Sequence, residues 1–118
     1  MAIDLHHLSQ ANPAGFRDIF PARASSALEG LRVIDVREVP EFDGPLGHID
    51  GAELVPLGTV VDAAAGWDRS QPLLLVCRMG GRSARAASDL ARLGFKNLYN
   101  LAGGMTGWNE AGLPVRRG

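Results

Sequence analysis

The fold is decided by residues 72–94, which read PLLLVCRMGGRSARAASDLARLG. The segment Leu73–Cys77 is entirely apolar and follows a proline, as expected of a strand buried on both faces of a parallel sheet. From Ser83 onward, apolar and polar residues alternate at helical spacing, and Gly94 stands where a left-handed helix C-cap belongs. The stretch therefore predicts a buried strand, a loop and an amphipathic helix.

Short apolar runs and helical patterns continue on both sides of this stretch. The segment Leu31–Val36 is rich in β-branched residues and reads as a buried strand, with a helical turn through Phe42 after it. Residues 51–56 and 97–101 give further short strands. Alternating strands and helices predict an α/β fold with a mainly parallel central sheet of about five strands, covered by helices on both faces.

The first 30 residues are patterned less clearly. Their apolar residues recur at spacings of one, three and four: Phe16, Ile19, Phe20, Ala24 and Leu28. This spacing predicts helical segments interrupted by Pro21. No repeat or linker divides the chain, so we expect residues 1–118 to form one domain, with residues 1–30 as a poorly patterned N-terminal segment within it.

The composition argues against several classes of protein. With 46% hydrophobic and 21% charged residues, the chain can form a continuous core. Twelve Lys and Arg against 13 Asp and Glu leave a charge of -1, and no basic face marks a nucleic-acid surface. No run approaches the roughly 18 apolar residues of a spanning helix, and the first residues lack the pattern of a secretory signal. We expect a cytoplasmic protein without nucleic-acid or membrane partners.

Cys77 is the single cysteine of the chain, which excludes an internal disulfide, a C-x-x-C redox pair and a multi-cysteine zinc site. A free cysteine is either a buried structural residue or a reactive one. Cys77 ends a buried strand, and ligands in open α/β sheets bind outside the carboxyl ends of the strands. His6, His7 and His48 form no ligand cluster, so no metal and no other cofactor is expected.

The loop after Cys77 is suited to holding negative charge on the sulfur. Gly80 and Gly81 can adopt positive φ, so that consecutive amides turn inward as an anion nest. The helix N-terminus and two arginines favour thiolate over thiol, so we expect the pKa of Cys77 to lie below the usual value of about 8.5. Ser83 is expected to cap the helix. A Cys77 persulfide would fit this cradle if the side chain is reachable from solvent.

These motifs resemble the rhodanese family of sulfurtransferases. The resemblance covers residues from about Leu31 to Val115. Its motifs, in order, are Asp35-Val-Arg37-Glu, Glu41-Phe42, Gly47-His-Ile-x-Gly-Ala52, Cys77-Arg-x-Gly-x-Arg-Ser and Leu101-x-Gly-Gly-Met-x-Gly-Trp108. It implies a three-layer fold in which Cys77 is the nucleophile. The residues implied to bind substrate are Arg78, Met79, Gly80, Gly81, Arg82 and Ser83.

The resemblance implies transfer of sulfane sulfur from an anionic donor such as thiosulfate to a thiophilic acceptor, which can be cyanide, a thiol or a protein. The cycle is ping-pong through a Cys77 persulfide, and it needs no general base because the nucleophile is already ionised. Arg78 or Arg82 would face the anionic donor. Asp35 and Arg37 follow a strand end and could brace the loop through a buried ion pair or backbone hydrogen bonds.

Two other functions remain open. The first is a non-catalytic rhodanese-like module that binds a partner or only relays sulfur, although inactive versions usually lose the loop cysteine, which this chain keeps. The second is a phosphatase or arsenate reductase, because related folds also place a cysteine in an anion-binding loop. Those loops are longer, whereas here four residues separate Cys77 from Arg82. The shorter loop leaves less room for a tetrahedral oxyanion.

Overall fold

A six-stranded sheet with the order β1-β2-β6-β5-β3-β4 forms the centre of the computed structural model, which describes residues 5–117. Neighbouring strands are parallel, except that β1 is antiparallel to β2. The strands are β1 (Gln10–Asn12), β2 (Phe16–Ile19), β3 (Arg32–Asp35), β4 (Glu53–Leu54), β5 (Leu73–Val76) and β6 (Leu98–Leu101). Because the strands from β2 to β4 are parallel, their carboxyl ends all lie on the same side of the sheet. β5 is one of the two central strands.

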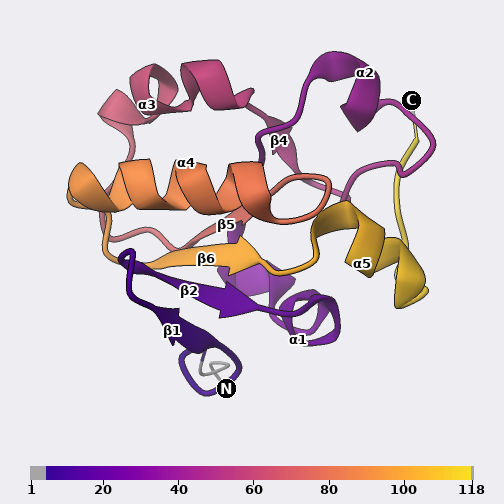
Figure 1. Ribbon diagram of the computed structural model, residues 1–118, viewed down its shortest axis with the longest axis horizontal. Coiled ribbons are helices and arrows are strands. Elements are labelled where there is room, and N and C mark those ends of the chain that lie inside the picture. Colours follow the sequence, from indigo (N-terminus) through magenta and orange to yellow (C-terminus); the bar gives the residue numbers. More distant parts are fainter. Residues whose placement is uncertain (1–4, 118) are drawn as a thin grey trace.

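Helices cover both faces of the sheet (Figure 1). One face packs against α3 and α4, and the other against α1 and α5. The α-helices are α1 (Pro21–Ser25), α2 (Val39–Phe42), α3 (Val60–Ala63), α4 (Gly81–Arg92) and α5 (Gly104–Glu110). Short 3-10 helices span Leu28–Gly30, Leu57–Thr59 and Ala64–Gly66. The architecture is the three-layer α/β arrangement expected from the sequence.

β5 is buried on both faces because each face has its own apolar core. Leu73 and Leu75 share a buried cluster with Leu90 of α4, whereas Leu74 and Val76 share one with Trp108 of α5. Side chains alternate along a strand, so a continuous apolar run supplies both cores at once. The prediction of a buried strand at residues 73–77 is confirmed, with β5 ending at Val76, so that Cys77 follows a strand held between both cores.

The helical prediction for residues 16–20 is wrong, because this segment contains strand β2. Phe16 lies in the core under α4 and Ile19 in the core under α5. A spacing of three puts two residues on one face of a helix, but on opposite faces of a strand. Both faces of β2 are covered, so the apolar spacing fits either structure. Pro21 does not interrupt a helix but opens α1 at its first turn.

With β1 and β2 the sheet has six strands within residues 5–117, rather than the expected number of about five. The strands predicted at residues 31–36, 51–56 and 97–101 are present as β3, β4 and β6, and the predicted amphipathic helix is α4, whereas α3 and α5 were not predicted. Gly94 follows α4 with a φ of +94°, as its predicted role at the helix C-terminus requires.

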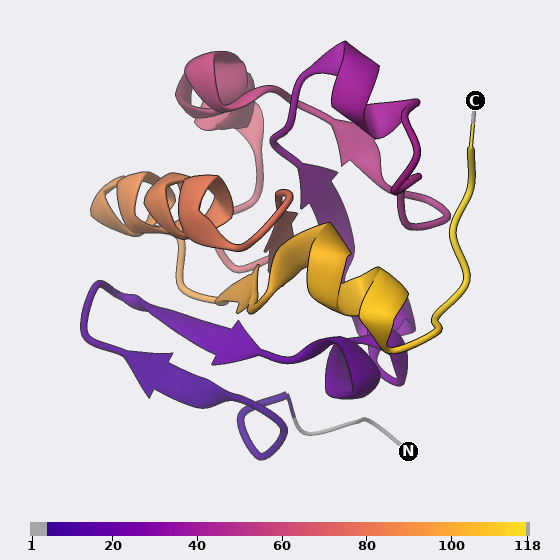
Figure 2. The ribbon, with the colours of Figure 1, turned by 45° about the vertical axis from the view of Figure 1, so that its right-hand side comes forward.

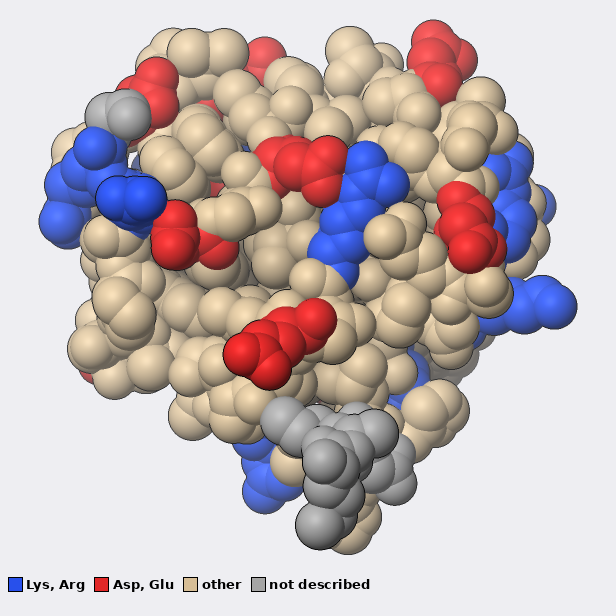
Figure 3. Space-filling model, turned by 180° about the vertical axis from the view of Figure 1, so that it is seen from behind, with Lys and Arg blue, Asp and Glu red and all other residues tan. Residues whose placement is uncertain are grey.

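The surface agrees with the near balance of charges in the sequence. On the face shown in Figure 3, acidic and basic side chains are interspersed, and neither sign forms a continuous patch. None of the helices within residues 5–117 has the length and apolar character needed to cross a membrane.

Candidate active site

Cys77 follows β5 directly, at the carboxyl edge of the sheet where the sequence predicted a nucleophile. Only 1% of the residue is exposed, so the expectation of a solvent-reachable thiol is not met in this conformation. Its sulfur is nevertheless in polar contact, because the N–H of Gly80 donates to Sγ at 3.0 Å and the Ser83 hydroxyl lies 3.2 Å from it. The thiol is thus covered by the loop but sits among hydrogen-bond donors.

The loop amides are turned inward at Gly80. This residue has a φ of +104° and is the N-cap of α4, which directs its N–H at the sulfur. Gly81 does not share this conformation: it is the first residue of α4, and a Cβ there would meet no atom within 4 Å. The prediction of positive φ therefore holds for Gly80 and is wrong for Gly81, because the helix begins two residues earlier than Ser83.

Ser83 is not the helix cap that the sequence suggested. It is the third residue of α4 and fully buried, and its hydroxyl lies between Cys77 Sγ at 3.2 Å and Asn100 Oδ1 at 2.5 Å. Asn100 comes from β6 and was missed by sequence reasoning, since a polar residue inside a short apolar strand carries no signal of its partner. Ser83 therefore contacts the predicted nucleophile directly.

The pKa of Cys77 is lowered, as expected, although by groups other than the arginines. Burial acts to raise the pKa of the thiol, but it is outweighed by hydrogen bonds from the Ser83 hydroxyl and from the backbone amides of Ser83, Gly80 and Met79. Hydrogen bonds to a thiolate stabilise the charged form, which is the nucleophile. The loop thus favours an ionised sulfur through short-range contacts.

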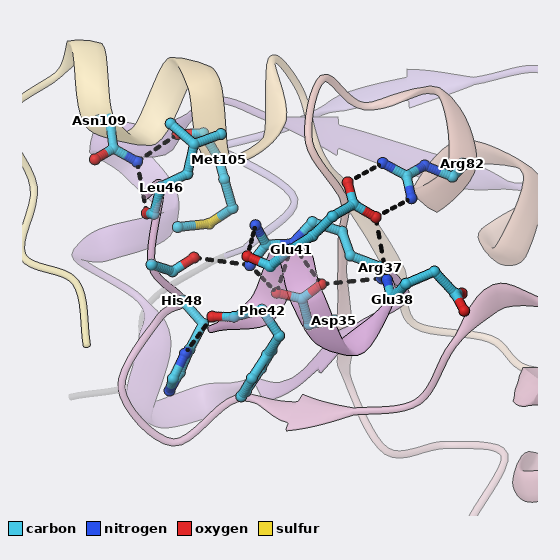
Figure 4. Close-up of polar contacts among 11 residues, drawn as sticks. Asp35, Arg37, Glu38, Glu41, Phe42, Leu46, His48, Arg82, Met105 and Asn109 are labelled. Atoms are coloured by element: carbon cyan, nitrogen blue, oxygen red, sulfur yellow. Dashed lines mark hydrogen bonds and ion pairs between the residues drawn. The ribbon is translucent and has the colours of Figure 1, made fainter. Parts of the chain in front are cut away.

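The two loop arginines have different surroundings. Arg82 makes a bidentate ion pair with Glu41 of α2, at 2.7 and 2.8 Å (Figure 4). This contact lowers the pKa of Glu41 to about 2, so the pair contributes stability above the ordinary Glu value of 4.5 and loses it as the pH falls through about 2. Arg78 is exposed, and within residues 5–117 its side chain has no ion-pair partner. Arg78 therefore offers a positive charge that no ion pair occupies among the residues that the structure describes.

A cavity of about 260 Å³ lies beside the loop. It is lined by Arg37, Glu41, Pro45, Leu46 and Arg78. The charged side chains come from the end of β3, from α2 and from the loop, whereas Pro45 and Leu46 supply an apolar wall. The cavity is a candidate entrance for a small anion or an acceptor thiol.

Asp35 and Arg37 form the buried ion pair that the sequence suggested, with Arg37 Nη2 2.8 Å from Asp35 Oδ2. The Arg37 side chain also donates to the backbone carbonyls of Glu41 at 3.1 Å and Gly47 at 2.8 Å (Figure 4). Among the described residues, the hydrogen bonds of this pair reach α2 and Gly47 and not the loop of residues 77–83. The pair therefore fixes the backbone at Glu41 and Gly47, on either side of the cavity-lining residues Pro45 and Leu46.

The same wall is fixed at two further points. Asn109 of α5 donates to the carbonyl of Leu46 at 3.0 Å, and His48 Nδ1 lies 2.9 Å from the carbonyl of Phe42. The rings of His48 and Phe42 also stack, with centroids 3.7 Å apart. His48 is structural, and no group of three or more His, Cys, Asp or Glu within residues 5–117 is placed to hold a metal ion.

The start of α5 is hydrogen-bonded to the backbone of the loop. The N–H groups of Met105 and Thr106 donate to the carbonyls of Cys77 and Arg78, both at 2.9 Å. Gly104 has a φ of +57°, and a Cβ on it would lie 2.5 Å from those carbonyl oxygens. Figure 2 shows the loop after β5 lying next to this helix start. The absence of a side chain at Gly104 lets the start of α5 approach the loop closely enough for these hydrogen bonds to form.

Comparison with known proteins identifies the family of this chain. The family model described as "Rhodanese-like domain" matches residues 20–111. Thiosulfate sulfurtransferase GlpE of Pseudomonas paraeruginosa is 36% identical over 96 residues, which cover 80% of this chain and 86% of that protein.

Solved structures show the same likeness. A rhodanese-related protein from Thermoplasma volcanium superposes with a TM-score of 0.77 at 29% identity, covering 86% of this chain and 98% of that one. The human single-domain sulfurtransferase TSTD1 gives a TM-score of 0.70 at 26% identity, with coverages of 79% and 95%. In sequence and in fold, this chain belongs to the rhodanese-like domain family.

Proposed function

We propose that the protein transfers sulfane sulfur from an anionic donor such as thiosulfate to a thiophilic acceptor, through a persulfide on Cys77. The observation that supports this most directly is the inward N–H of Gly80, 3.0 Å from a sulfur at the N-terminus of α4. A donor aimed at the sulfur stabilises the negative charge that the nucleophile carries before transfer. We place the activity in the cytoplasm, where thiols remain reduced.

Two displacements complete the cycle. The Cys77 thiolate attacks the outer sulfur of thiosulfate, an S–S bond forms on Cys77, and the S–S bond of the donor breaks so that its electron pair leaves with sulfite. The acceptor, which is cyanide, a thiolate or a protein thiolate, then attacks the terminal sulfur. The S–S bond to Cys77 breaks and its electron pair restores the thiolate. Arg78, Met79, Gly80, Gly81, Arg82 and Ser83 form the loop around these steps.

The sulfur of Cys77 is buried beneath the loop, so the donor needs a path to it. Met79 at the outside of the loop is 69% exposed, and Arg78 lines the adjacent cavity. We propose that the donor enters this cavity, binds to Arg78, and reaches Cys77 when the outer part of the loop shifts. Arg82 is not proposed to bind the donor, because its charge is already paired with Glu41.

The role of Arg78 is tested by Arg78→Gln. A hydrogen bond to a charged group contributes about 1.5–3 kcal/mol, so kcat/KM for thiosulfate should fall by about 10- to 100-fold, mainly through KM. The matched control is Arg85→Gln, which removes an exposed arginine of α4 that does not line the cavity. Equal losses in both variants, or none in either, would contradict a donor site at Arg78.

The function itself is tested by intact mass spectrometry after incubation with thiosulfate. We expect the protein to gain one sulfur atom, to release sulfite, and to return to its original mass when cyanide is added, with thiocyanate as the product. Protein alkylated beforehand at its single cysteine should gain nothing. No added sulfur would instead favour a non-catalytic module, and rapid hydrolysis of an aryl phosphate without thiocyanate formation would favour a phosphatase.

A further inference from the structure

The Ser83 hydroxyl has one proton and two neighbours that can accept it. Its Oγ lies 2.5 Å from Asn100 Oδ1 and 3.2 Å from Cys77 Sγ. An amide oxygen has no proton to give, so the short contact with Asn100 requires the hydroxyl proton of Ser83. A thiolate has no proton either. Ser83 therefore cannot donate to the amide oxygen and to a Cys77 thiolate at the same time.

The orientation of the Asn100 amide is fixed from its other side. Its Nδ2 donates to Asp18 Oδ1 at 3.0 Å and to the carbonyl of Gly80 at 3.3 Å. Asp18 is itself held, since Asn12 Nδ2 donates to its second carboxyl oxygen at 3.1 Å. Turning the amide over would bring Oδ1 against two acceptors inside a site where Asn100 is 4% exposed. The oxygen of Asn100 therefore has to face Ser83.

We propose that Asn100, oriented by Asp18, is a positioning residue that draws the Ser83 proton away from the free Cys77 thiolate. In the neutral thiol the chain is complete, because S–H donates to Ser83 Oγ and the Ser83 hydroxyl donates to Asn100. In the thiolate, the sulfur accepts the hydrogen bond from the Ser83 hydroxyl. No proton then lies between Ser83 Oγ and Asn100 Oδ1. That arrangement is repulsive at 2.5 Å.

The persulfide of the proposed function relieves this competition. Its Sγ is bonded to carbon and to the second sulfur, and the negative charge lies on the terminal sulfur. Sγ then needs no proton, and Ser83 keeps its bond to Asn100. The network thus favours the sulfur-loaded protein over the free thiolate. This part rests on the proposed function, whereas the effect on thiol ionisation does not.

The test compares Asn100→Leu with Ser83→Ala by following the rate of alkylation of Cys77 by iodoacetamide against pH. Without its amide oxygen, Asn100→Leu frees the Ser83 proton for the thiolate, so the midpoint should move to lower pH. Ser83→Ala removes the donor, so the midpoint should move to higher pH. Neither variant replaces a charged group around the site, although Asn100→Leu removes one donor to Asp18, and the double variant described next corrects for that loss. These charged groups are Asp18 on β2, Asp35 and Arg37 at the end of β3, Glu41 on α2, Arg78 in the loop and Arg82 in α4.

The double variant decides whether Asn100 acts through Ser83. Combining Asn100→Leu with Ser83→Ala should give the midpoint of Ser83→Ala alone. An unchanged or higher midpoint in Asn100→Leu would overturn the proposal, and so would a downward shift that persists without Ser83. Asn100→Ala gives the same readout if the leucine variant does not fold.

A second readout follows sulfur loading. In mixtures of thiosulfate and sulfite, the equilibrium between persulfide and free thiolate should shift toward thiolate by about five- to tenfold in Asn100→Leu, as expected for one hydrogen bond. If no variant and no wild-type protein takes up sulfur, the proposed function fails. The alkylation profiles still report on Asn100 in that case.

Discussion

Cys77→Ser is expected to fold like the wild type and to lose sulfur transfer by at least about 10³-fold, as is typical when a covalent nucleophile is removed. An oxygen in place of sulfur changes the side-chain volume little, and the N–H of Gly80 can still donate to it. An alcohol is not ionised at neutral pH and forms no persulfide. The measurement is the rate of thiocyanate formation from thiosulfate and cyanide.

Thermal unfolding of the same variant supplies the control. An unfolding temperature close to that of the wild type would show that the lost turnover is chemical rather than structural. Turnover that survived the substitution would remove Cys77 from the mechanism, whatever the state of the loop.

Gly104→Ala is expected to destabilise the protein by about 2–4 kcal/mol and to reduce transfer strongly, although this residue is not the nucleophile. Its φ is +57°, and the new Cβ would lie 2.5 Å from the carbonyl oxygens of Cys77 and Arg78. Those carbonyls accept the N–H groups of Met105 and Thr106. The methyl group would break this support and rotate the loop amides away from the sulfur. Thermal unfolding and the thiocyanate assay measure the two effects.

Gly112→Ala is the matched control for this substitution. Gly112 also has a left-handed backbone, with a φ of +71°, but a Cβ on it would meet no atom within 4 Å. It should lose only about 1 kcal/mol from backbone strain and keep its activity. If both variants lost stability and activity equally, the contact between Gly104 and the loop would not explain the effect.

Much of the fold follows from the sequence because its signals are local. The apolar run of β5 and the amphipathic pattern of α4 each identify one element without reference to any other. β2 could not be assigned this way, since Phe16 and Ile19 satisfy helix spacing as well as burial on opposite faces of a strand. Only the strand neighbour β6 decides between the two.

In the candidate site, too, the residues of one local segment could be predicted, and those contributed by other elements could not. Cys77, Gly80 and Arg78 belong to one short segment, and its pattern indicates their roles. Glu41, Asn100 and Gly104 approach that segment from three other elements, and no local pattern shows which loop residue each will meet. The burial of the Cys77 sulfur could not be predicted for the same reason, because it depends on how those elements pack around the loop.

The burial of Cys77 also limits oxidation between molecules. Two sulfurs must approach to about 2 Å to form a disulfide, and two residues that are each 1% exposed cannot bring their sulfurs that close in this conformation of the loop. The chain has no second cysteine with which to couple. A single recessed thiol is thereby kept from covalent dimerisation in this conformation, and remains available to small molecules that can reach it.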